Sequence, residues 1–341
     1  MSAVITFLLP SEFLNQELPG SLQDDWSKCG GSVHGVIYAT YVALREKQID
    51  CRVSSEIPER GIIIAHPITL ARHKPLFSQQ HYIVCWQQDF PRCDWAHLHI
   101  VMNKNTTSRA SLPLYDAALW PGPRHVLHYI PEPKLIPRNS SRGSVFENLG
   151  YMGQADNLLP EIQSQMTRQR IEAMGCRLCI HDAELSRSDY SDIDAVLAIR
   201  PARHELKQKS PHKLWNAWRA GVPAILGPEP GFRDYRRSEL DYIEAANVEE
   251  ALAAIHKLKH NPELRRAMVE NGQKRAAECS VESLVAEWRS FIEGPLQQYA
   301  SKWFEGPAWQ RQAFHAVRGL RMTLRKVRNS WLNKKGVAHL V

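Results

Sequence analysis

The chain has 341 residues, of which 43% are hydrophobic and 23% are charged, as in an ordinary soluble globular protein. No run approaches the roughly 18 apolar residues of a membrane-spanning helix, and the length indicates about two domains. The formal charge of +7 is concentrated in residues 297–341, which carry nine basic side chains and one acidic one. A protein that binds nucleic acid usually spreads basic charge over a folded face, so we expect no nucleic-acid partner.

The first 130 residues alternate short apolar runs with polar or helical segments, which predicts a parallel α/β sheet. A helix is expected over residues 33–48, where apolar positions recur with helical period. Strands are expected at residues 4–9, 51–54, 61–66, 82–86, 97–102 and 126–130.

The N-terminal residues and the cysteines indicate the cellular compartment of the protein. The first residues have neither the basic region nor the cleavage site of a signal peptide. Seven cysteines at irregular spacing indicate a reducing compartment. Cys176 and Cys179 lack a second pair at zinc spacing, so we expect them to be packed and reduced. These features predict a cytoplasmic protein.

Several polar residues of this half lie where a parallel sheet binds ligands, beyond the carboxyl ends of its strands. Gly30 and Gly31 precede the expected helix and His34 lies one turn into it, which makes them candidates for acceptor binding. His66 and Asp89 follow apolar strands and are candidates for acid–base catalysis. Each residue type is also common in turns and in ordinary packing, so both interpretations stay open.

A linker rich in Pro, Ser and Gly at residues 131–143 leads into a second α/β series. Its strands are expected at residues 146–153, 177–181, 195–199, 224–226 and 241–245. Its helices are expected at residues 158–174, 211–220, 248–258, 262–279 and 281–293. The two halves are similar in kind and not in sequence.

The stretch 209–229 combines a helix, a strand and a loop. Ser210 suits a helix N-cap, Pro211 suits the first helical position, and Gly221 ends the helix. A short buried strand and a turn-rich loop follow. The helix N-terminus offers backbone N–H donors and a positive dipole end, which suit a phosphate group.

This stretch resembles the C-terminal domain of GT-B glycosyltransferases, chiefly the retaining superfamily that uses nucleotide sugars. The resemblance covers about residues 146–292 and includes the helices at 248–258 and 262–279. The matching residues in the central stretch are Lys213, Leu214, 216–218, 220–225 and 227–229.

The resemblance implies an α/β protein with two Rossmann-like domains that face a cleft. Residues 1–135 would form the acceptor domain, residues 144–295 the donor domain, and residues 296–341 a basic amphipathic helical tail. The implied reaction moves a sugar from a nucleoside diphosphate sugar to an acceptor, with retention and without a metal. The nucleotide sugar is then a substrate, and no cofactor is implied.

The sequence departs from the family pattern at several donor-site positions. Asn216 and Gln208 stand where the family has a pair of glutamates, and a usual Arg and Lys after the first strand are missing. The donor site implied by the residues present consists of Gly153, Gln154, Asn157, Arg200, Lys209, Lys213, Asn216 and Glu229.

Transfer from a nucleoside diphosphate requires stabilisation of the charge that builds on the leaving diphosphate. We expect Lys213 to be the main catalytic cation, with Arg200 or Lys209 second, and Glu229 to bind hydroxyl groups. The alternatives are a solvated Lys and a surface Glu. Asp192 and Asp194 have the spacing of a metal-binding pair, but they precede a strand at the end away from the crevice. We therefore expect them to be structural.

The tail from about residue 309 to 331 is helical by period. An apolar stripe runs along one side, with arginines beside it; its members are Val317, Leu320, Leu324, Val327 and Trp331. The helix would pack on the body, or residues 311–335 would attach to an anionic membrane surface.

Two other functions stay open beside glycosyl transfer. One is a GT-B-like protein that binds a nucleotide or glycan without catalysis, and the missing Arg and Lys favour it. The other is a peripheral protein of the inner membrane face. The sequence leaves the acceptor unknown among glycans, lipid-linked sugars and small molecules.

Overall fold

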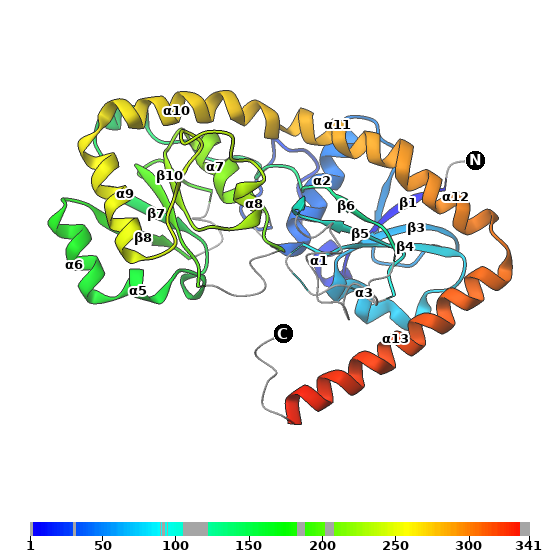
Figure 1. Ribbon diagram of the computed structural model, residues 1–341. Coiled ribbons are helices and arrows are strands. Elements are labelled where there is room, and N and C mark those ends of the chain that lie inside the picture. Colours follow the sequence, from blue (N-terminus) through cyan, green and yellow to red (C-terminus); the bar gives the residue numbers. More distant parts are fainter. Residues whose placement is uncertain are drawn as a thin grey trace.

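The computed structural model consists of two α/β domains joined by long C-terminal helices (Figure 1). It describes residues 3–29, 32–88, 90, 93, 95–104, 122–182, 188–201 and 208–334. All pairs of described strands are parallel, which confirms the fold class expected from the alternation of apolar strands and helices.

The first domain contains six described strands in the order β2-β1-β3-β4-β5-β6. In chain order they are β1 (Ile5–Leu8), β2 (Arg52–Ser54), β3 (Gly61–Ala65), β4 (His81–Trp86), β5 (Leu98–Val101) and β6 (Arg124–Val126). Five strands lie where the sequence predicts them. The prediction for the sixth, residues 126–130, is wrong by a few residues, because the apolar run continues past the strand into the segment that joins the domains.

Helices cover both faces of this sheet. They are α1 (Ser11–Leu14), α2 (Val33–Glu46) and α3 (Pro67–His73), and a 3-10 turn, η1 (Lys74–Leu76), follows α3. The Ser32 hydroxyl caps α2 by accepting from the Gly35 amide. Alternate residues of the buried strands pack on opposite sides, as a parallel sheet covered on both faces requires.

The second domain has five described strands in the order β11-β10-β9-β7-β8. They are β7 (Asn148–Met152), β8 (Arg177–His181), β9 (Ala195–Ala198), β10 (Ala224–Leu226) and β11 (Ile243–Glu244). The helices are α5 (Pro160–Gln163), α6 (Gln165–Ala173), α7 (His212–Ala220), α8 (Pro230–Arg233), α9 (Val248–His260) and α10 (Pro262–Ala276), and the 3-10 turns are η4 (Ser140–Arg142), η5 (Ala155–Asn157) and η8 (Ala277–Cys279).

Two expectations for this domain are wrong in detail. The helix predicted at residues 158–174 is two helices, because Ser164 leaves the helical conformation and its hydroxyl caps α6. The loop after β10 begins a further short helix, α8, with Glu229 at its N-cap position.

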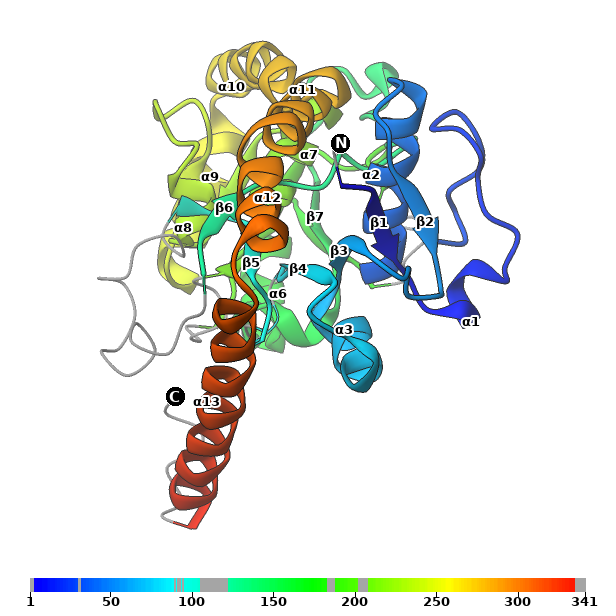
Figure 2. The same cartoon turned by 90° about the vertical axis from the view of Figure 1, so that its right-hand side faces the viewer.

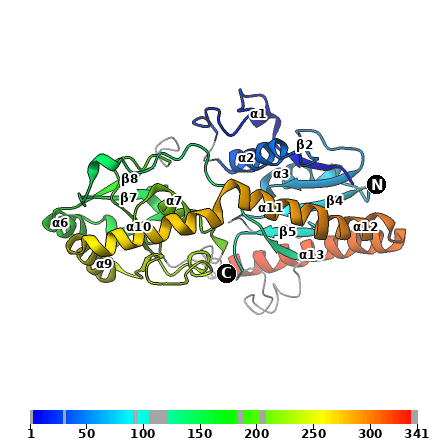
Figure 3. The same ribbon diagram turned by 90° about the horizontal axis from the view of Figure 1, so that it is seen from above.

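The C-terminal helices return to the first domain (Figure 3). Helix α11 (Val281–Phe291), a π-helical segment at Ile292–Leu296 and α12 (Gln297–Glu305) form one nearly continuous run beyond α10. Trp288 and Phe291 lie in the core of the first domain, and the Trp288 indole donates to the carbonyl oxygen of His128. Residues 281–305 thus pack on the first domain, across the boundary expected at residues 295/296.

Helix α13 (Ala308–Lys334) confirms the helical tail, and most of it extends away from the two domains (Figure 2). Its first turns pack on the body, where the Phe314 ring stacks on His97 with 4.4 Å between centroids. Arg318 is buried there, with its guanidinium 3.7 Å from the Phe314 ring centroid, so this basic group does not join the exposed arginines expected for the tail. None of the described helices is both long enough and apolar enough to cross a membrane.

Candidate functional site

Helix α7 places the polar residues of the stretch 209–229 at the boundary between the domains. It begins at His212, and Gly221 ends it in the left-handed conformation at φ 69°. The predicted cap is wrong: Pro211 occupies the N-cap position, and the Ser210 hydroxyl lies 3.3 Å from the hydroxyl of Tyr129 in the first domain. The start of α7 is therefore held by contacts between domains.

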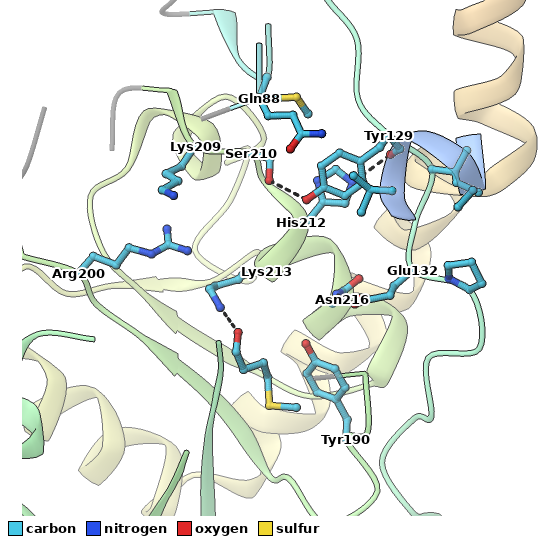
Figure 4. A pocket seen from close by; sticks show the side chains of 16 residues that line it. Gln88, Tyr129, Glu132, Tyr190, Arg200, Lys209, Ser210, His212, Lys213 and Asn216 are labelled. Carbon is cyan, nitrogen blue, oxygen red and sulfur yellow. Dashed lines mark hydrogen bonds between the residues drawn. The ribbon is translucent and has the colours of Figure 1, made fainter. Parts of the chain in front are cut away.

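A cavity of about 230 Å³ lies against the N-terminal half of α7 (Figure 4). Both domains line it. Its polar lining residues are Gln88, Tyr129, Glu132, Tyr190, Arg200, Lys209, Ser210, His212, Lys213 and Asn216. The cavity is lined by four residues of the predicted donor site. Arg200 follows the C-terminal end of β9, Lys209 precedes α7, and Lys213 and Asn216 lie in α7.

Basic side chains gather at one part of this cavity. The Lys213 ammonium donates to the carbonyl oxygen of Met152, at the end of β7, and lies 4.7 Å from the Tyr151 ring centroid. Arg200 follows β9, and Lys209 precedes α7. Three cations beside the positive end of a helix favour an anionic ligand such as a phosphate group.

Glu229 is buried behind these cations, with 2% of the residue exposed, and pairs with Arg200. It does not belong to the lining of the cavity. Burial raises the pKa of its carboxyl group, whereas the charges of Arg200, Lys213 and Lys209 oppose that rise. The position of Glu229 supports a role in holding Arg200.

The rest of the cavity is lined by aromatic and amide groups. His212 stacks on the Tyr129 ring with 3.6 Å between centroids, and its Nε2–H donates to the Tyr129 carbonyl oxygen. Burial holds the pKa of His212 well below its usual range, and His128 lowers it further. The Asn216 amide nitrogen donates to Glu132 at 3.3 Å. This part offers aromatic surfaces and hydrogen-bond acceptors, which include the Glu132 carboxylate.

Hydrogen bonds between the domains close the cavity beside residues 208–210. Gln87 donates its amide to Gln208 at 2.9 Å, and Asn103 donates to the Lys209 carbonyl oxygen at 3.1 Å. Gln208 occupies the position of the first family glutamate, and its side chain is engaged by the first domain. These contacts place Lys209 at the cavity wall.

Other predicted residues lie away from this cavity. His66 is fully buried, and its Nδ1 accepts from the Ile68 amide at the start of α3. His34 lies 6.1 Å from His66 between ring centroids and contacts Thr69. Neither histidine lines the cavity. Gly30, Gly31 and Asp89 lie outside the described residues.

The loop after β7 approaches the cavity without lining it beyond Met152. Asn157 donates its amide to the exposed Gln154 at 3.3 Å. A Cβ atom at Gly153 would lie 2.9 Å from the Lys213 Nζ atom, so a glycine here leaves room for the ammonium. The absence of a side chain at Gly153 therefore allows the Lys213 ammonium group to occupy its position.

Asp194 is structural, as its position before β9 predicts. It is 2% exposed and accepts from the Arg138 and Arg142 side chains and from the amides of Glu147 and Asn148. The Asp192 side chain is 81% exposed. Among the residues that the structure describes, no three His, Cys, Asp or Glu side chains gather in a way that could hold a metal ion.

Residues of the segment between the domains were absent from the predicted site. Tyr129 and Glu132 line the cavity, and so does Tyr190 from the second domain. The sequence predicts a strand at Tyr129 and a Pro-rich linker from residue 131, and neither pattern indicates that the two side chains turn towards α7.

Two parallel-sheet domains that share a cavity, with C-terminal helices that return to the first domain, are the GT-B fold of glycosyltransferases, and this chain has that fold. No protein-family model and no curated protein matches the sequence. Among solved structures, HepE from Anabaena in complex with UDP and glucose gives a TM-score of 0.51 at 13% identity, over 85% of this chain and 99% of that chain.

The same protein with UDP-glucose gives a TM-score of 0.50 at 14% identity, over 84% of this chain and 99% of that chain. A TarM variant from S. aureus, in a complex that contains UDP, gives 0.50 at 10% identity, over 74% of this chain and 59% of that chain. At such low identity these likenesses establish the fold.

Proposed function

We propose that this protein is a glycosyltransferase that moves a sugar from a nucleoside diphosphate sugar to an acceptor. The observation that carries the proposal is the interdomain cavity, where Arg200, Lys209 and Lys213 gather at the N-terminus of α7. The solved proteins of the same fold are described with UDP and UDP-glucose, which supports a donor of this class.

The proposed chemistry uses these cations on the leaving group. As the bond between the sugar C1 and the diphosphate oxygen breaks, its electron pair passes to the diphosphate, and the acceptor oxygen bonds to C1 and passes its proton to an acid–base residue. Lys213 and the α7 amides would stabilise the developing charge from a fixed position. We propose retention without a metal, by the resemblance. His66 and Asp89 remain proposed acid–base residues, and Gly30, Gly31 and His34 proposed acceptor contacts.

Calorimetric titration with UDP, GDP and ADP tests the donor site. We expect one of them to bind, and Lys213→Ala to weaken that binding at least tenfold, because a charge-assisted contact is lost. Lys257→Ala, which removes an exposed lysine of α9, is the matched control. Unchanged affinity in Lys213→Ala would contradict the assignment of the site.

Turnover separates an enzyme from a binding protein. Incubation with a panel of nucleotide sugars should release the nucleoside diphosphate, by transfer or by slow hydrolysis, and Lys213→Ala should reduce this release. Tight nucleotide binding with no release from any donor, with candidate glycan and lipid-linked acceptors present, would favour the catalytically inactive alternative.

We also propose that α13 attaches the protein to an anionic membrane surface from the cytoplasmic side. Its apolar stripe is exposed beyond the first turns, with Val317, Leu320, Leu324 and Val327 between 44% and 63% exposed. The sequence places arginines and lysines beside this stripe. A basic amphipathic helix of this kind lies in the headgroup region, and each basic residue adds about 1 kcal/mol near an anionic surface.

Vesicle co-sedimentation tests the attachment. The intact chain should bind vesicles of phosphatidylglycerol and phosphatidylcholine, and Leu320→Ser/Leu324→Ser should lose most of that binding. Met166→Ser, at an exposed apolar residue of α6, is the matched control. Equal binding by all three proteins would remove this proposal without affecting the donor site.

A further inference from the structure

A second cavity lies in the second domain, at the amino ends of the strands of its sheet. It has a volume of about 400 Å³ and lies between residues 143–146 and helix α10. Asp194 and Pro223, which directly precede β9 and β10, line it. The interdomain cavity lies instead at the carboxyl ends of these parallel strands, and no described residue lines both cavities.

We propose that this second cavity binds a small organic carboxylate that has an apolar body. Its size falls in the range of small-molecule sites, which are mostly apolar with a few placed polar groups. The apolar lining consists of Val145, Phe146, Gly221, Pro223, Pro262 and Val269. The side chains of Arg138 and Arg265 supply the cationic part of the lining. This assignment does not depend on the reaction at the interdomain cavity.

The guanidinium groups of Arg138 and Arg265 are held close together. Arg265 Nη2 donates to the carbonyl oxygen of Ser144 at 2.8 Å, and Arg138 Nη2 donates to that of Val145 at 2.9 Å. The two acceptors belong to neighbouring peptide groups, so the two cations are neighbours as well. Burial lowers the pKa of Arg265 and the charge of Arg138 lowers it further, whereas Asp194 opposes this shift. A bound anion would relieve the repulsion between the two cations.

The carboxylate buried at this wall is already shared. Asp194 pairs with Arg138 at 2.8 Å and with Arg142 at 2.7 Å. It also accepts from the backbone amides of Glu147 and Asn148. With Arg265, three guanidinium groups therefore gather near one carboxylate, and the inner wall of the cavity carries an excess of positive charge.

Both lining arginines retain a hydrogen-bond donor for a ligand. Among the residues that the structure describes, Arg138 Nη1 and Arg265 Nε have no hydrogen-bond partner. Neither atom is one of the fully buried polar atoms, so a ligand in the cavity can reach both. A carboxylate has two oxygens that accept hydrogen bonds, and bonds between ionised groups are the strong ones.

The rim of the cavity favours one negative charge over two. Glu263 and Glu270, on α10, also line the cavity and are exposed. Arg266 lies 4.0 Å from Glu270, and both side chains are largely in solvent, so this pair contributes little. A dianion such as a phosphate monoester would be repelled by Glu263 more strongly than a carboxylate would.

Titration of the full chain with three probes of similar size tests the proposal. The probes are phenylacetate, the uncharged phenylacetamide and the dianion phenylphosphate, followed by ligand-observed NMR. Phenylacetate should bind with a Kd of about 1 mM or lower, as about ten non-hydrogen atoms allow. Phenylacetamide should bind about tenfold more weakly, because it lacks the charge-assisted hydrogen bonds. Phenylphosphate should bind no more tightly than phenylacetate.

Two variants locate the binding. Arg138→Gln should reduce the preference for phenylacetate over phenylacetamide to about threefold or less, with the affinity for phenylacetamide unchanged because the shape of the cavity is kept. Val269→Trp fills the cavity and should weaken phenylacetate binding at least tenfold. Met166→Trp, at an exposed apolar residue of α6, is the matched control and should bind as the intact protein does. Thermal unfolding checks that each variant folds, and Arg138→Gln decides the matter alone if Val269→Trp does not.

Several results would overturn the assignment. Phenylacetate that fails to bind below about 10 mM, or that binds Val269→Trp unchanged, removes the site. Equal affinity for phenylacetate and phenylacetamide, or a preference that persists in Arg138→Gln, removes the role of the guanidinium groups. Tighter binding of phenylphosphate at this cavity would contradict the choice of a carboxylate. Each of these results leaves the donor site untouched, because nucleoside diphosphate binding tests that site separately.

Discussion

Arg200 and Glu229 form an ion pair that joins the end of β9 to the loop after β10, with side chains only 11% and 2% exposed. Glu229 Oε1 and Arg200 Nε are buried without hydrogen-bond partners among the residues described. Hydrogen bonds therefore offset only part of the free-energy cost of burying these two charged groups. The ion pair fixes the Arg200 guanidinium at the wall of the cavity.

Removal of one partner should be costly. Arg200→Ala leaves the Glu229 carboxyl buried and unpaired, so we expect the free energy of unfolding to fall by about 3 kcal/mol. The loss should be smaller at low pH than at high pH, since burial raises the pKa of the Glu229 carboxyl group and removal of Arg200 raises it further. Urea unfolding measures both values. Arg170→Ala breaks an exposed pair with Glu249 and should cost less than about 1 kcal/mol. Equal losses in the two variants would contradict this account.

Gly153→Ala should affect both the fold and the ligand, because Gly153 has a φ of 157°, which residues with a side chain rarely adopt. In Gly153→Ala the new methyl group would lie 2.9 Å from the Lys213 Nζ atom and would displace the ammonium from the cavity. We expect nucleoside diphosphate affinity to fall by about tenfold in calorimetric titration. Gly143→Ala is the control, because Gly143 also has a positive φ, 48°, and a Cβ atom there meets no atom within 4 Å. An unaffected affinity in Gly153→Ala would show that Lys213 has room to adjust.

His128 should make stability depend on pH. Burial lowers its pKa from 6.5 to about 4, so the folded protein binds this proton less readily than the unfolded chain. The stabilisation is complete above pH 6.5 and is lost as the pH falls towards 4. His128 alone should reduce the free energy of unfolding by about 2 kcal/mol between pH 7.5 and pH 5. His128→Gln should flatten the pH dependence by this amount in urea titrations, whereas the exposed His256→Gln should retain the native slope.

Asp194 should matter for stability and not for the ligand. Burial raises its pKa, but hydrogen bonds from Arg142 and from the Asn148 and Glu147 amides outweigh that effect and hold the pKa below its ordinary value. Asp194→Asn should lower the free energy of unfolding by about 3 kcal/mol, because two arginines lose their shared counter-charge.

Nucleotide affinity should stay within twofold of the native value in Asp194→Asn. Asp192→Asn, at an exposed side chain, should change neither quantity. A selective loss of nucleotide binding in Asp194→Asn would contradict the structural role of Asp194.

Local patterns in the sequence predicted most of the fold. Apolar runs that alternate with amphipathic helices define parallel strands, because side-chain period and strand length are local properties. Gly221 ends α7, and Asn247 and Ser280 cap α9 and α11, by interactions that span only a few residues. Such patterns also identified Lys213 at the start of α7.

Only the tertiary structure decided which distant residues share the cavity. Arg200, Lys213 and Asn216 meet Tyr129 and Glu132 because the interdomain segment folds against α7, and its composition carries no sign of that contact. Ser210 illustrates the limit: its local pattern favoured a cap, but a hydroxyl from the other domain engages it. The sequence by itself determined the two layered sheets and the charge of α7, since these depend on neighbours along the chain. The residues that each charged side chain contacts depend on the position of the other domain, and tertiary packing determines that position.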